Sequence, residues 1–89
     1  MNPSQQMPPW MFILDGTFLG FLDSDRIQTT YLTLDVEQEQ MDIQLPQELR
    51  RSSLDWLRPG DQIRCIGQSQ LDFHSKTLKL SAYQVLSLT

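Results

Sequence analysis

The turn Arg58-Pro59-Gly60-Asp61 limits most strongly what this chain can fold into. Proline fixes its own φ and has no backbone N–H, so a helix cannot continue through Pro59. Glycine adopts positive φ at no steric cost, so Gly60 suits a tight turn. Apolar residues then alternate with polar ones at Ile63 and Cys65, which indicates a strand. We therefore expect a helix before this turn and a strand directly after it.

Three strands are predicted before that helix, over residues 10–22, 27–36 and 40–45. The first is long and contains Gly16 and Gly20, and glycine within a strand indicates a bulge or a sharp bend. In the third strand Met41, Ile43 and Leu45 alternate with polar residues, so these three side chains are expected in the core. In the second strand one face carries Gln28, Thr30, Leu32, Leu34 and Val36, and the later, apolar members of this set are expected in the core.

The remaining elements are a helix over residues 47–57 and strands over residues 61–71 and 77–86, joined by a hairpin loop at residues 72–76. The helix is predicted because Leu54 and Leu57 lie on one helical face. An inward Val85 requires a slip in register near Gln84. Three strands, a helix and two more strands are the order of the OB-fold, so we predict an all-β, five-stranded Greek-key barrel.

Several short motifs resemble those of known OB-like domains. Leu54 to Leu71 and Lys76 to Val85 resemble the second half of bacterial OB-fold domains, in which a Pro-Gly-Asp turn precedes a strand that ends in glycine. The motifs FLGF (18–21), LPQELR (45–50) and KLSAY (79–83) resemble an OB-like domain at the start of some cyanobacterial proteins. A thioredoxin-like 2Fe–2S ferredoxin domain follows in those proteins. Its cluster-binding cysteines are absent here, so the redox function is not carried over.

The composition excludes several kinds of site. One cysteine and one histidine cannot form a structural zinc site or ligate an iron–sulfur cluster. No apolar run approaches the ~20 residues of a membrane-spanning helix, and the residues before Trp10 lack the basic residues of a signal peptide. We therefore expect a cytoplasmic protein with no metal, no cofactor and no membrane contact. Residues 1–9, rich in proline, are expected to be a disordered tail, and residues 10–89 a single OB-like domain.

No pattern in the sequence predicts catalysis. Cys65 and His74 are the obvious nucleophile and base, but Cys65 falls on the apolar face of its strand, where a thiol is usually inert. The glycines do not form a phosphate-binding loop. We therefore expect no catalytic residues and a protein that is not an enzyme.

OB-folds that bind single strands use aromatic and basic residues on the outer face of the second and third strands and in the adjoining loops. The residues of this kind that could bind a ligand here are Arg26, Tyr31, Thr33, Phe73, His74 and Lys76. The predicted outer face also carries Asp35 and Asp42 but no base, and the net charge is −4, which opposes binding to phosphate. The leading hypothesis is therefore a small binding or accessory module for a protein partner. The alternative is a weak single-stranded nucleic-acid binding protein.

Overall fold

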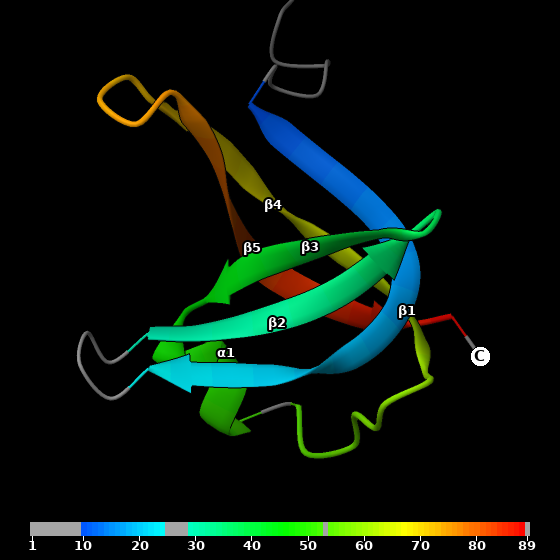
Figure 1. The fold of residues 1–89 in the computed structure, drawn as a ribbon. Helices are drawn as coiled ribbons and strands as arrows, with labels where there is room; N and C mark the ends of the chain where they lie inside the picture. Colours follow the sequence, from blue (N-terminus) through cyan, green and yellow to red (C-terminus); the bar gives the residue numbers. More distant parts are fainter. Residues whose placement is uncertain (1–9, 25–28, 53, 89) are drawn as a thin grey trace, which may run out of the picture.

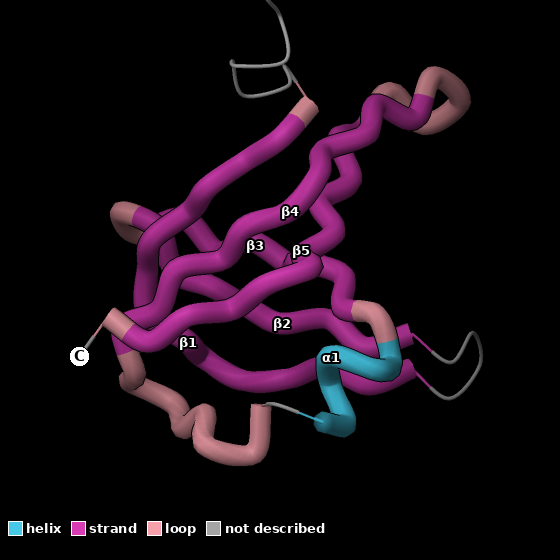
Figure 2. Tube along the Cα trace, turned by 180° about the vertical axis from the view of Figure 1, so that it is seen from behind, coloured by secondary structure: helices cyan, strands magenta, loops and turns pink. Residues whose placement is uncertain are grey.

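Five strands close into one barrel in the computed structural model, which describes residues 10–24, 29–52 and 54–88 (Figure 1). The elements are β1 (Met11–Ser24), β2 (Thr29–Val36), β3 (Glu39–Leu45), α1 (Gln47–Ser52), β4 (Gln62–Asp72) and β5 (Thr77–Ser87). Around the barrel the strands follow the order β1-β2-β3-β5-β4. Figure 2 shows α1 beside the ends of β1 and β2, at one end of the barrel. The predicted five-stranded OB-like barrel, with its helix between the third and fourth strands, is confirmed.

Strand β1 is shared by both sides of the barrel because it is long and curved (Figure 1). Its first half, residues 11–17, pairs antiparallel with β4, and residues 17–24 pair antiparallel with β2. The register with β2 shifts between Phe18 and Gly20, so Leu19 is the extra residue of a β-bulge. The predicted irregularity in this strand therefore lies at Gly20.

The core lies on the inner faces that the alternating patterns predicted. Leu32 and Leu34 of β2 and Ile43 of β3 are completely buried, and Leu45 is nearly so. Met41, which was predicted to join them, is only half-buried near the start of β3. The full set of buried apolar residues is Phe18, Leu32, Leu34, Ile43, Leu45, Leu54, Leu57, Ile63, Cys65, Ala82 and Val85.

A second bulge explains why Val85 faces inward together with Ala82. Ile66 pairs with Gln84 but Gly67 pairs with Ala82, so Tyr83 is the extra residue on β5. A Cβ at position 67 would collide with the backbone of β5, so the two strands can approach this closely only at a glycine. The slip in register predicted near Gln84 is thereby confirmed.

The helix is shorter than the sequence predicted. It ends at Ser52, whereas the leucine spacing predicted a helix through residue 57. Leu54 and Leu57 are buried all the same, from the irregular segment after the helix, where the Leu57 N–H donates to the Leu54 carbonyl. The leucine spacing therefore reflects burial and not helical structure, and serine is a weak helix former. The predicted tail at residues 1–9 and the predicted strand residues 27–28 lie outside the described residues.

The turn at Pro59 and Gly60 joins the two halves of the fold. Gly60 has a φ of +99°, as its position in the turn predicted. Its N–H donates to the Phe18 carbonyl at 2.8 Å, and the Phe18 N–H donates to the Asp61 carbonyl at 2.8 Å. The Arg58 N–H donates to the Asp61 carboxylate at 2.9 Å. The turn is therefore bonded directly to β1, next to its bulge.

Replacing Ile43 by alanine should destabilise the protein by about 2–5 kcal/mol, because it removes buried methyl groups and leaves a cavity. Gln40, on the same strand, is exposed, so Gln40→Ala should cost less than about 0.5 kcal/mol. Urea denaturation of both variants measures the difference. Equal denaturation midpoints would contradict the register of β3.

Replacing Gly60 by L-alanine should cost about 1–3 kcal/mol, because an L-residue is strained at this positive φ. A Cβ at this position would meet no atom within 4 Å, so the cost comes from the backbone conformation and not from a clash. D-alanine, introduced by chemical ligation, is the matched control because it favours positive φ. Equal loss of stability in the two variants, measured by thermal unfolding, would disprove the conformational explanation.

Candidate functional site

The outer parts of β4 and β5 extend beyond the barrel as a two-stranded arm, residues 70–79 (Figure 1). The described contact of β4 with β1 ends at Ser69, whose N–H donates to the Trp10 carbonyl. Beyond that point β5 is the only described strand that pairs with β4, for example at Leu71 with Leu78 and Gln70 with Lys79. The arm therefore presents both of its faces and its tip to a partner.

The arm is unusually apolar for an exposed hairpin. Phe73 is 81% exposed, and Leu71 and Leu78 are about half exposed. A cavity of about 290 Å³ lies beside this surface and is lined by Gln70, Leu71, Asp72, Phe73, His74 and Lys79. An exposed aromatic ring beside a cation is suited to stacking against a flat, negatively charged ligand.

The loop at the tip is ordered by Asp72. Its carboxylate accepts hydrogen bonds from the backbone N–H groups of His74 at 3.0 Å and Ser75 at 3.4 Å. These two bonds, followed by the Ser75 side chain and the charge of Lys79, lower the pKa of Asp72, so the group stays ionised. The Lys79 ammonium lies 3.6 Å from this carboxylate. Asp72 therefore shapes the tip and offsets part of the positive charge beside the cavity.

A second surface, here called the outer face, runs across β2, β3 and β5. Tyr31 on β2 pairs with Gln44 on β3, and Gln44 pairs with Ser81 on β5. Next to this row, the Thr33 hydroxyl donates to the Asp42 carboxylate at 2.9 Å. On β5, two residues beyond Ser81, Tyr83 is 51% exposed. The outer face thus joins two tyrosines and several polar side chains to the base of the arm.

The structure places the predicted binding residues in two groups. Tyr31 and Thr33 lie on the outer face, whereas Phe73, His74 and Lys76 lie at the tip of the arm. Arg26 lies outside the described residues.

Two further residues, Lys79 and Tyr83, were not among the predicted site residues. The sequence pattern of β5 puts both on the same face as Ser81, opposite Leu80 and Ala82. Their position on the strand next to β3 depends on the parallel pairing of β3 with β5, which periodicity does not reveal.

Cys65 and His74 are not brought together as a catalytic pair. Cys65 is completely buried in the core, and His74 is exposed at the tip of the arm. Burial, with a smaller effect of the Asp15 charge, raises the pKa of the Cys65 thiol to about 12, so the thiolate does not form at neutral pH.

Within the three described ranges, no group of three or more His, Cys, Asp or Glu residues is placed to hold a metal ion. No helix in the described part of the chain is long and apolar enough to cross a membrane.

No protein-family model matches this sequence, and no curated protein matches it. Its structure, in contrast, is similar to several solved structures. Rim1, a mitochondrial single-stranded DNA binding protein of S. cerevisiae, has a TM-score of 0.71 at 12% identity, over 93% of this chain and 98% of Rim1. A chain of the S. pombe Stn1–Ten1 complex has a TM-score of 0.67 at 16% identity, over 92% of this chain and 60% of that chain. The SSB domain of a Synechococcus protein has a TM-score of 0.58 at 16% identity, over 91% of this chain and 98% of the domain.

These similarities show the fold and support the predicted OB-like domain. They do not support the narrower resemblance to domains that precede a ferredoxin domain. The names of these three structures do not mention a ferredoxin domain. That narrower resemblance therefore stays a prediction from the motifs alone.

The stability of the protein should fall between about pH 9 and pH 12 because of Cys65. The unfolded chain releases the thiol proton near its ordinary pKa of 9.0, whereas the folded protein holds it until about pH 12. The unfolded state therefore binds fewer protons in this range, and the free energy of unfolding decreases as the pH rises. Cys65→Val should show a smaller decrease in urea denaturation over the same range. An identical pH dependence in both proteins would contradict this assignment.

Proposed function

We propose that this protein binds single-stranded nucleic acid through the arm and the outer face. The observation that carries the proposal is Phe73, an aromatic ring 81% exposed beside a cavity that Lys79 also lines. Stacking of a base on an aromatic ring contributes about 1–3 kcal/mol and tolerates any base. The structural similarity to two single-stranded DNA binding proteins supports the same reading.

The outer face would continue the path of the strand across the barrel. Tyr31 and Tyr83 offer further rings, and Gln44 and Ser81 lie on the same face. Amide and hydroxyl groups can donate hydrogen bonds to base edges and accept them. We therefore infer that the arm holds the first bases and that the outer face holds the following ones.

The binding should be weak at physiological salt. Backbone affinity comes from neutralising phosphates with lysine or arginine, which releases counterions. Here the net charge is −4, Lys79 lies 3.6 Å from Asp72, and Asp42 lies on the outer face. We expect a dissociation constant on the order of 10 μM or weaker at about 0.15 M salt.

A protein partner is the second candidate, because the arm also exposes Leu71 and Leu78 across from each other. An apolar pair of this kind suits contact with another protein as well as contact with bases. A pulldown from native lysate, with and without nuclease, separates the two candidates. Proteins that are captured through a bound nucleic acid are lost after nuclease treatment, whereas a directly bound protein partner is kept. A cytoplasmic location and the lack of catalytic activity belong to this proposal and stay predictions.

Replacing Phe73 by leucine should weaken the binding of a labelled single-stranded oligonucleotide about 5- to 100-fold, because it removes one stacking ring but keeps an apolar side chain. Fluorescence anisotropy at low salt, where binding is strong enough to measure, gives the dissociation constants. Lys76→Ala should reduce the slope of log K against log salt by about 1, because one phosphate contact is lost.

Arg64→Ala is the matched control for the lysine variant. Arg64 already forms an ion pair with Asp15, with 2.7 Å between Nε and Oδ1, and this pair belongs to the pairing of β1 with β4. The control should therefore leave the salt slope unchanged. If the wild type, Phe73→Leu and Lys76→Ala bind the oligonucleotide with equal dissociation constants, the arm is not the interface.

A further inference from the structure

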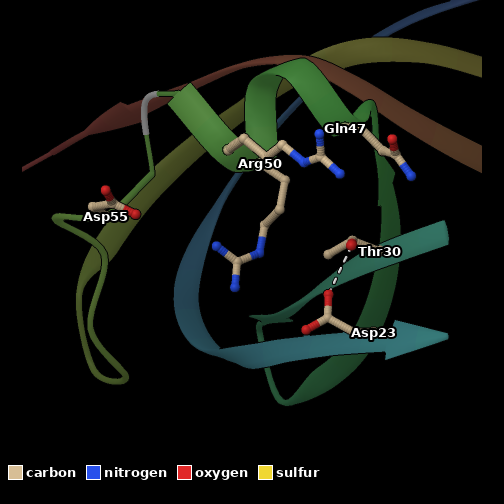
Figure 3. A pocket seen from close by; sticks show the side chains of 6 residues that line it. Asp23, Thr30, Gln47, Arg50 and Asp55 are labelled. Atoms are coloured by element: carbon tan, nitrogen blue, oxygen red, sulfur yellow. Dashed lines mark hydrogen bonds between the residues drawn. The ribbon is translucent and has the colours of Figure 1, made fainter. Parts of the chain in front are cut away.

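A second cavity, of about 320 Å³, lies between α1 and the adjoining ends of β1 and β2 (Figure 3). It is lined by Asp23, Thr30, Gln47, Arg50, Arg51 and Asp55. None of these residues belongs to the arm or to the outer face. The cavity therefore needs an explanation of its own.

Arg50 is held over an aromatic ring with part of its hydrogen-bonding capacity unused. Its guanidinium carbon lies 3.8 Å from the centre of the Phe21 ring. Its Nε atom is buried and has no hydrogen-bond partner among the described residues. A guanidinium directs its N–H bonds outward in its own plane, so contact of its face with a ring leaves them available. A buried donor without an acceptor is costly, and an acceptor bound in the cavity would remove that cost.

The carboxylates of the cavity do not supply this acceptor. The Asp23 carboxylate accepts a hydrogen bond from the Thr30 hydroxyl at 2.7 Å, which Figure 3 shows as a dashed line. In the described part of the chain, neither Arg50 nor Arg51 forms an ion pair with either aspartate. Two guanidinium groups therefore line the same cavity without forming an ion pair to any described carboxylate.

We propose that this cavity binds a carboxylate group of a small ligand, held by Arg50 and Arg51. The planar fork of a guanidinium matches the two oxygens of a carboxylate in a pair of parallel hydrogen bonds. The charges of Asp23 and Asp55 lie in the same cavity, so a group with one negative charge is tolerated better than a phosphate monoester, which carries up to two. This proposal concerns a different surface from the nucleic-acid site and does not depend on it.

The test is a titration of the full ¹⁵N-labelled chain with sodium acetate, in which sodium chloride is lowered to keep the ionic strength constant. The arginine Nε–H signals are followed by NMR. The Arg50 signal should shift and saturate, with a dissociation constant on the order of 1–10 mM. Inorganic phosphate at the same concentrations should bind more weakly. A shift that grows linearly without saturation, or tighter binding of phosphate than of acetate, would overturn the proposal.

Three variants test the named residues. Arg50→Lys keeps the charge but loses the fork, so acetate should bind at least 5-fold more weakly. Asp23→Asn removes a repelling charge, so acetate should bind more tightly. Arg64→Lys, outside the cavity, should bind as the wild type does.

Arg51→Gln keeps the proposal testable if Arg50→Lys does not fold, because Arg51 is exposed and its replacement removes no packing. It too should bind acetate more weakly. Acetate affinity that is unchanged in both arginine variants would reject the site.

Discussion

Two backbone hydrogen bonds join Phe18 of β1 to the turn at Gly60 and Asp61. Both are 2.8 Å long, and they run in opposite directions. They fix β1 at the point where it leaves β4 and begins to pair with β2. The Phe18 side chain enters the core at this same point and contacts Phe21 edge to face, with ring centres 4.9 Å apart. Phe18 therefore contributes both the backbone hydrogen bonds to the turn and a buried side chain to the core.

Closing the barrel at this joint has a consequence for the site. Among the described residues, the contact of β1 with β4 extends to the bond between the Ser69 N–H and the Trp10 carbonyl. Strands β4 and β5 continue outward beyond this point and form the arm. Leu71, Phe73 and Leu78 are exposed because no third strand among the described residues pairs with the hairpin. The same topology that buries the core creates the candidate interface.

Most of the fold was predictable from the sequence, because strands with one buried face show their register in an alternating pattern. Ile43 and Leu45, and Ile63 and Cys65, are examples, and each of these side chains is buried. The glycine at position 60 was predictable for a different reason, since the turn demands positive φ. The helix end was not predictable from periodicity. Leu54 and Leu57 belong to the irregular segment after the helix and are buried there, but their spacing of three residues is also that of one helical face.

The candidate sites were less predictable, because they depend on contacts between distant segments. Tyr31 and Tyr83 belong to one sheet surface because β3 pairs with β2 on one side and, in parallel at Gln44 and Ser81, with β5 on the other. The cavity at Arg50 depends on the stacking of that residue against Phe21, 29 positions earlier in the chain. A pattern with a period of two residues contains no information on either contact.

The positions of the lysines and arginines distinguish the arm from the outer face as a surface for phosphate groups. Among the arginines of the described residues, Arg58 donates to the carbonyls of Asp55 and Leu57, Arg64 pairs with Asp15, and Arg50 stacks on Phe21. Both lysines of the chain, Lys76 and Lys79, lie on the arm. The outer face itself carries Asp42 and, on β2, Asp35. In the proposed function, a nucleic acid would gain electrostatic attraction at the arm and lose it on β2 and β3, so contact would begin at the arm and extend across the barrel mainly through stacking.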